Sequence, residues 1–170
     1  MLISRLAYRT RQFWNALAGS RKTVETEALL PHLTPLQIDL FRRMQVSEQV
    51  HANKVLEYLK ASGQNDPHLL AAALLHDVGK APYPPNVLDR VIVVLGSHFF
   101  RKGTARWSEG TPAGLRRPFV VAAHHSAWGA DLATRAGASP RTVELIRRHH
   151  DPLSSDDPLL IALQVADDTN

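Results

Sequence analysis

The chain has 170 residues, 44% of them hydrophobic and 21% charged, a composition typical of one globular domain with its own core. It contains no cysteine, which excludes disulfides and thiolate metal sites and leaves nine histidines, with Asp and Glu, as the available metal ligands. The formal net charge of +4 is modest, so it indicates at most a preference for anionic ligands such as phosphates.

The first region, residues 1–34, is predicted to hold a basic amphipathic helix and a connector. Over residues 2–17, Leu6, Phe13 and Leu17 fall near one side of a helix, with arginines elsewhere. We interpret this helix as one that packs on the main body, and membrane-surface or partner binding is the alternative. The arginines exclude a secretory signal, and no apolar run reaches transmembrane length. We therefore expect a cytoplasmic protein with no transmembrane segment.

The second region, residues 35–170, is predicted to be a helical domain with short loops. The predicted helices span residues 35–44, 48–62, 67–78, 86–100, 118–136, 140–150 and 159–168. Cap residues followed by proline mark several of the starts, and Ser47 is the predicted cap of the second helix. The β-branched run at 91–95 would also suit a strand, but every neighbour is helical. We predict an all-α fold of about six to eight helices.

One stretch organises this domain. Asp66 and Pro67 begin a helix that continues through the unbroken apolar run 69–75 and reaches His76 and Asp77. Such a helix is buried on most of its surface, and it is too short to cross a bilayer. A buried imidazole and carboxylate each require a partner, and a divalent metal ion satisfies both at once. The alternative is a buried histidine that is hydrogen-bonded to its neighbours.

Further polar side chains are predicted to face the interior from other helices. His51 lies on the inner face of the second helix, and Asp167 lies on the buried side of the last one. Two histidine pairs each follow an apolar segment: His124-His125 and His149-His150. A single buried histidine is commonly satisfied by its neighbours, whereas several helices that turn His or Asp to the same interior indicate a shared metal centre.

This pattern resembles the HD-domain superfamily of metal-dependent phosphohydrolases. The resemblance lies in His51, in the stretch 75–80 (LHDVGK) and in Asp167, and it covers roughly residues 47–168. It implies that the fold is the helical bundle of an HD domain. The Gly-Tyr-Pro motif of the cyclic-dinucleotide phosphodiesterase branch is absent, which disfavours that branch.

The two-metal branch, which is similar to HD-type dinucleoside polyphosphate hydrolases with a di-iron centre, adds two histidines to this pattern. The resemblance implies that one metal is held by His51, His76, Asp77 and Asp167. It implies that the second is held by Asp77, His125 and His149, with Asp77 bridging. His124 and His150 are adjacent alternatives that spacing does not distinguish, and they are otherwise expected to support the ligands or to contact substrate.

The implied activity is hydrolysis of a phosphate ester or anhydride by a metal-activated water. The expected catalytic residues are Asp77 and Lys80. Lys80 lies about one helical turn further along, where it is expected to hold a phosphate or assist the leaving group, or else to cap the helix end. The expected cofactor is one or two divalent ions of Fe, Mn, Zn, Co or Ni, with Mg a weaker fit. The expected substrate is a phosphorylated small molecule, with nucleotides as the favoured class.

Two other functions fit the same residues. One is an HD-type di-iron oxygenase, and the other is a non-catalytic regulatory module that is stabilised by its metal. Specific nucleic-acid binding is disfavoured because no recognised binding motif accompanies the basic N-terminal helix. The sequence leaves open which substrate is used, which metal is bound, how many ions there are and what the oligomeric state is.

Overall fold

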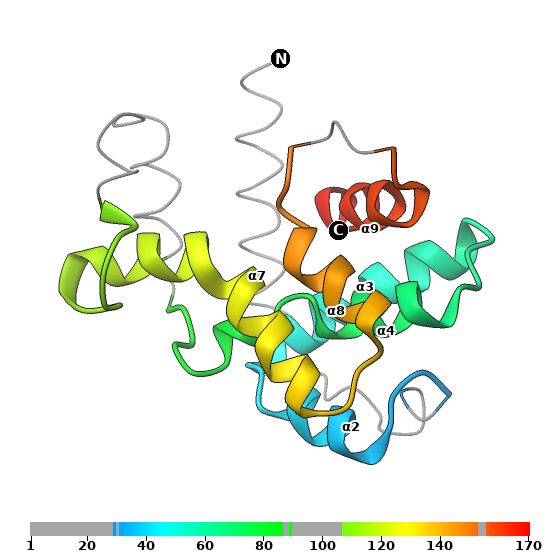
Figure 1. The fold of residues 1–170 in the computed structure, drawn as a ribbon, viewed down its shortest axis with the longest axis horizontal. Coiled ribbons are helices and arrows are strands. Elements are labelled where there is room, and N and C mark those ends of the chain that lie inside the picture. Colours follow the sequence, from blue (N-terminus) through cyan, green and yellow to red (C-terminus); the bar gives the residue numbers. More distant parts are fainter. Residues whose placement is uncertain (1–28, 30, 87–88, 90–106, 153–155) are drawn as a thin grey trace.

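The computed structural model of this chain describes residues 29, 31–86, 89, 107–152 and 156–170. Its defined elements in this part are all helical, which confirms the all-α prediction (Figure 1). They are α2 (Pro35–Arg42), α3 (Val46–Ala61), α4 (Pro67–Leu75), the 3-10 helix η2 (Val78–Lys80), the 3-10 helix η3 (Gly114–Arg116), α7 (Arg117–Arg135), α8 (Pro140–Arg148) and α9 (Pro158–Thr169). The helix predicted over 2–17 and most of that over 86–100 lie outside the described residues.

Four of these helices begin with a cap residue followed by proline, as predicted. The caps are Thr34, Asp66, Ser139 and Asp157. The Asp66 carboxylate, for example, accepts hydrogen bonds of 2.9 Å from the backbone N–H groups of His68 and Leu69. These bonds satisfy amides that a helix start leaves without an intrahelical partner, and proline at the first position has no such amide to satisfy.

The start of α3 differs from the prediction. Ser47 is not its cap, because the helix begins two residues earlier, after Gln45, and no side chain caps it. The Gln45 carbonyl accepts the amides of Glu48 and Gln49 at 2.9 and 3.0 Å, which places the serine inside the first turn. Buried Val55 and other apolar residues of this helix hold it in the core, so its start does not depend on a cap.

The helix α4 is the centre of the fold. Every residue from Leu69 to Leu75 is buried, and the helix packs against α3, α8 and α9. It ends at Leu75, earlier than the predicted stop near Gly79, and the chain then tightens into η2. His76 and Asp77 therefore lie in the turn just beyond the helix rather than within it. No described helix is both long enough and apolar enough to span a bilayer.

The long helix α7 crosses η2 and lies beside α8 (Figure 1). The backbones of η2 and α7 come into contact at two glycines, Gly79 and Gly129. A Cβ on Gly79 would overlap the carbonyl oxygen of His125 and would lie 2.6 Å from the backbone nitrogen of Gly129. Only a residue without a side chain permits this approach, which holds the turn that contains Asp77 against the helix that carries His125.

Replacing Gly79 by alanine is expected to destabilise the fold by about 3 kcal/mol or more, because no rotamer change relieves a clash with backbone atoms. Gly129→Ala is the comparison variant, because its Cβ would lie 3.2 Å from the backbone nitrogen of Gly79, a tight contact that requires a small shift but is not an overlap. We expect it to destabilise the fold less than Gly79→Ala does, since alanine also favours the helix. Urea unfolding followed by circular dichroism measures both, and equal losses would contradict the role of Gly79.

Candidate metal centre

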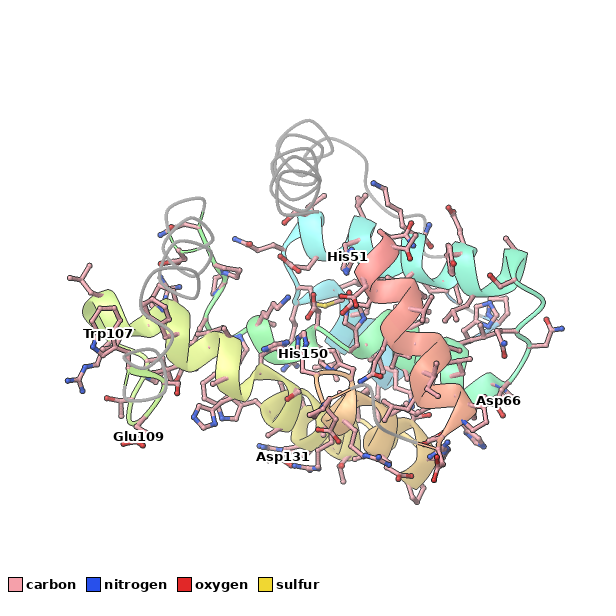
Figure 2. The ribbon with its side chains drawn as sticks, turned by 90° about the horizontal axis from the view of Figure 1, so that it is seen from above. His51, Asp66, Trp107, Glu109, Asp131 and His150 are labelled. Atoms are coloured by element: carbon pink, nitrogen blue, oxygen red, sulfur yellow. The ribbon has the colours of Figure 1, made fainter. Side chains whose placement is uncertain are left out.

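Seven side chains from α3, α7, α9 and the segments that follow α4 and α8 come together around the buried Asp77, with His51 and Asp167 partly buried and His150 exposed, and are here called the inner cluster. They are His51, His76, Asp77, His125, His149, His150 and Asp167. All six metal ligands predicted from the sequence belong to it. His51 and His150 approach the same central region from different elements (Figure 2).

The first part of the inner cluster joins α3, the turn after α4, and α9. His51, His76 and Asp167 each offer a ligand atom, and these atoms lie within 4.8 Å of one another. The Nε2 atom of His51 donates to Oδ1 of Asp167 over 2.8 Å. Asp167 turns inward from α9 whereas Asp168 is exposed, in agreement with the helical periodicity.

The second part joins α7 to the end of α8. His125, His149 and His150 also offer atoms within 4.8 Å of one another. The first two rings are buried, and His150 is exposed. The Nε2 atoms of His125 and His150 are 3.1 Å apart. Both members of the 149–150 pair therefore reach the cluster.

Asp77 connects the two parts. Its Oδ2 lies 3.5 Å from Nε2 of His76, and its Oδ1 lies 3.5 Å from Nε2 of His125. The rings of His76 and His149 also meet, with centroids 5.2 Å apart. One carboxylate thus faces imidazoles of both parts with different oxygens, which is the arrangement that a bridging ligand requires.

The two histidines of the 124–125 pair point to different sides of α7. His124 is exposed, and its Nε2 donates to the Ser108 carbonyl over 3.0 Å. Its ring stacks on Trp128 with a centroid distance of 5.7 Å. A rotation of about 100° per residue turns His125 inward when His124 points outward. The family-based choice of His125 therefore agrees with the geometry.

Three rings of the inner cluster are oriented by backbone carbonyls of their own helices. The Nδ1 atom of His76 lies 2.9 Å from the carbonyl oxygen of Ala73, and that of His149 lies 2.7 Å from the carbonyl oxygen of Ile146. His125 makes the same bond, over 3.0 Å, within α7. A carbonyl only accepts, so Nδ1 must carry the proton in each case, which leaves Nε2 as the atom that faces the cluster.

Two of these inward atoms make no hydrogen bond within the described part of the chain: Nε2 of His76, which lies 3.5 Å from carboxylate oxygens of Asp77 and Asp167, and Nε2 of His149. Both rings are buried. The two carboxylates offset the charge of a protonated His76, whereas an unsatisfied buried polar atom such as Nε2 of His149 costs about 1–3 kcal/mol. A divalent ion bound by imidazole nitrogen and carboxylate oxygen would satisfy both. The donor set therefore fits a metal centre.

The buried histidine rings differ in the direction in which their pKa is shifted. Burial and the nearby Lys80 lower the pKa of His125 to about 4. Burial also lowers the pKa of His149 well below its ordinary value, and both rings are therefore neutral near pH 7. For His76 burial acts in the same direction, but the carboxylates of Asp77 and Asp167 outweigh it and raise the pKa to about 9. Without metal, His76 is protonated, and it must lose that proton to bind an ion.

Glu48 is a residue of this region that the sequence did not reveal. Lys80 places Nζ 2.6 Å from Oδ2 of Asp77 and 3.6 Å from Oε2 of Glu48. Burial alone would lower the pKa of Lys80, but the two acids raise it above its ordinary value. Glu48 lies three residues before His51 on α3, and this spacing was the only signal for it.

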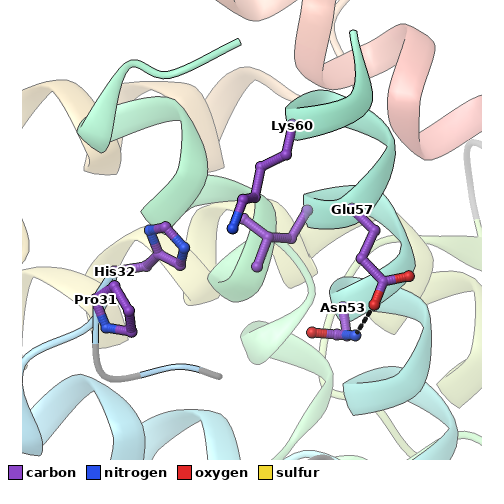
Figure 3. Close-up of a pocket in the computed structure, with 6 residues that line it drawn as sticks. Pro31, His32, Asn53, Glu57 and Lys60 are labelled. Atoms are coloured by element: carbon purple, nitrogen blue, oxygen red, sulfur yellow. Dashed lines mark hydrogen bonds between the residues drawn. The ribbon is translucent and has the colours of Figure 1, made fainter. Parts of the chain in front are cut away.

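A separate pocket of about 420 Å³ is lined by Pro31, His32, Asn53, Leu56, Glu57 and Lys60 (Figure 3). In it, Asn53 donates a hydrogen bond of 2.9 Å to Glu57. None of the lining residues belongs to the inner cluster, so this pocket is not part of the candidate site.

The raised pKa of His76 predicts that the metal-free protein loses stability between pH 7 and pH 9.5. The folded pKa of about 9 exceeds the ordinary value of 6.5, so the stabilisation is complete below pH 6.5 and disappears as pH rises through 9. The ring is fully buried, and the effect is on the order of 3 kcal/mol. Urea unfolding with a chelator present measures it. His124→Gln should keep the pH dependence and His76→Gln should abolish it, and a flat profile for the unmodified chain would contradict the prediction.

Comparison with known proteins places this geometry in a family. The sequence matches the HD domain family over residues 49–170, which is more than half of the chain and includes every member of the inner cluster. No match was found among curated proteins or among solved structures. The family match and the helical fold agree, and the chain belongs to the HD domain family.

Proposed function

We propose that this chain is a metal-dependent phosphohydrolase that cleaves a phosphate ester or anhydride of a small molecule, with nucleotides as the expected substrate class. The observation that carries the proposal is the buried Asp77 carboxylate, which faces Nε2 of His76 and Nε2 of His125 with different oxygens beside the buried Nε2 of His149, an atom without a hydrogen-bond partner among the described residues. Membership of the HD domain family supports it, because the family consists mostly of metal-dependent hydrolases.

The proposed ligands follow the two parts of the inner cluster. One ion is held by His51, His76, Asp77 and Asp167. The second is held by Asp77, His125 and His149, with His150 as a further donor within reach. Imidazole and carboxylate ligands suit Fe, Mn, Zn, Co or Ni better than Mg. When bound, such an ion lowers the pKa of water toward neutrality and offsets the charge of phosphoryl oxygens.

The residues of the chain supply orientation and charge around that chemistry. The Nδ1–H bonds to backbone carbonyls orient the rings of His76, His125 and His149 so that Nε2 of each faces the inner cluster. Lys80 stays positively charged, because Asp77 and Glu48 raise its pKa, so it suits attraction of phosphate oxygens and not proton donation. Arg147 is less suited to this role because its guanidinium pairs with Asp131 at 2.7 Å.

We expect hydrolysis to require a metal ion. Protein stripped by a chelator should release no phosphate from a panel of nucleoside phosphates, dinucleoside polyphosphates and simple phosphoesters, and one of the transition metals should restore the activity. Metal analysis of the purified protein and a phosphate-release assay measure this. Oxygen consumption without phosphate release would favour the oxygenase, and a metal-bound protein inert in both assays would favour the regulatory module.

The adjacent histidines of α7 provide a matched pair of variants. His125→Ala should lower kcat by about a hundredfold or more and weaken metal binding, since it removes a proposed ligand. His124→Ala makes the same change one residue away, on a ring that points out of the cluster, and should retain near-normal values. Asp77→Ala should abolish both metal binding and hydrolysis, and full activity in that variant would end the proposal.

A further inference from the structure

Lys80 shares one carboxylate oxygen with the proposed metal site. Its Nζ lies 2.6 Å from Oδ2 of Asp77, and the same Oδ2 lies 3.5 Å from Nε2 of His76. The Asp77 side chain is 4% exposed and that of Lys80 is 24% exposed, so solvent screens this contact weakly. The ammonium group is thus a cation already held on the oxygen that faces a proposed ligand ring.

A metal ion on that oxygen and the ammonium group would repel each other. A carboxylate ligand typically lies about 2.0–2.2 Å from a bound transition metal. A divalent ion and a protonated lysine that shared one oxygen would then be two like charges a few ångströms apart in a poorly screened interior. Either Lys80 leaves Asp77 when an ion binds, or the ion binds weakly.

A second acid lies within reach of Lys80. Oε2 of Glu48 is 3.6 Å from Nζ, and the Glu48 side chain is only 7% exposed. Glu48 belongs to the same helix as the proposed ligand His51 and lies three residues before it. Because the lysine stem is flexible and both acids already lie within ion-pair distance, a side-chain rotation suffices to move the ammonium from one to the other.

We propose that the Lys80 ammonium group is paired with the Asp77 carboxylate in the metal-free protein and moves to the Glu48 carboxylate when an ion binds. Glu48 is then a positioning residue for metal binding. The inference rests on the metal site proposed above. It concerns the exchange of one cation for another and does not depend on which reaction follows.

The test is titration of the metal-free protein with Co²⁺, followed by calorimetry and by the visible absorption of the bound ion. Glu48→Gln should weaken Co²⁺ binding about tenfold, because it removes the acid that lies within ion-pair distance of Lys80 besides Asp77 in the described part of the chain. Lys80→Met should strengthen binding about tenfold, because the competing cation is gone. Glu57→Gln, an exposed site on the same helix, is the control for loss of one negative charge and should change affinity less than about twofold.

The double variant, Glu48→Gln together with Lys80→Met, distinguishes an effect of Glu48 through Lys80 from direct electrostatic attraction between Glu48 and the ion. If Glu48 acts through Lys80, adding Glu48→Gln to Lys80→Met should change Co²⁺ affinity less than about threefold. A tenfold loss in that background would overturn the proposal, as would unchanged or weaker binding in Lys80→Met alone. If Glu48→Gln fails to fold, Lys80→Met still decides. Absence of Co²⁺ binding in the unmodified chain would instead remove the metal site itself.

Discussion

A buried carboxylate requires positive charge or hydrogen-bond donors around it, and Asp77 is such a carboxylate, with a side chain only 4% exposed. Burial alone would raise its pKa, but Lys80, His76 and His125 together hold the pKa well below its usual value. Asp77 therefore stays ionised, with the Lys80 ammonium and the protonated His76 ring beside it. The metal proposal, the charge state of Lys80 and the role inferred for Glu48 all follow from this one buried charge.

The backbone makes that environment possible. The end of α4 at Leu75 lets the chain turn, and the glycine at 79 lets that turn approach α7 more closely than any side chain would allow. Proximity of Asp77 to His125 is thus a property of main-chain contact and not of flexible side chains. A site held in this way keeps its donors in position before any ligand arrives, which reduces the ordering cost of binding.

Local chemistry made much of this predictable. Cap–proline pairs located four helix starts, and the apolar run 69–75 located the core helix. Helical periodicity placed His51 and Asp167 on the sides of their helices that face the inner cluster. What was missed depends on contacts between distant segments. No local signal ends the central helix at Leu75, because the turn there is set by packing against α7.

The site, too, was predictable where local periodicity decides and was not predictable where contacts between distant segments decide. Periodicity within α7 separates His124 from His125, but the 149–150 pair lies beyond the regular helix, where ring directions depend on tertiary contacts. Glu48 reads in the sequence as an ordinary acid in the first turn of a helix, favourable to the helix dipole. Its relation to Lys80 appears only when α3 and η2 are seen together. The six proposed ligands could be named from the sequence because the family resemblance supplied what spacing alone left open.

His76 and His149 are also the residues at which their helices stop. Each is the C-cap residue of its helix, α4 or α8, and each Nδ1–H bonds a carbonyl in the final turn. Carbonyls there lack amide partners from the helix itself. Each of these imidazoles therefore directs Nε2 to the inner cluster and hydrogen-bonds the end of its own helix through Nδ1–H. Amide hydrogen exchange in those two terminal turns would therefore respond to a ligand at the proposed centre that moves either ring, because the movement would weaken the hydrogen bond at that helix end.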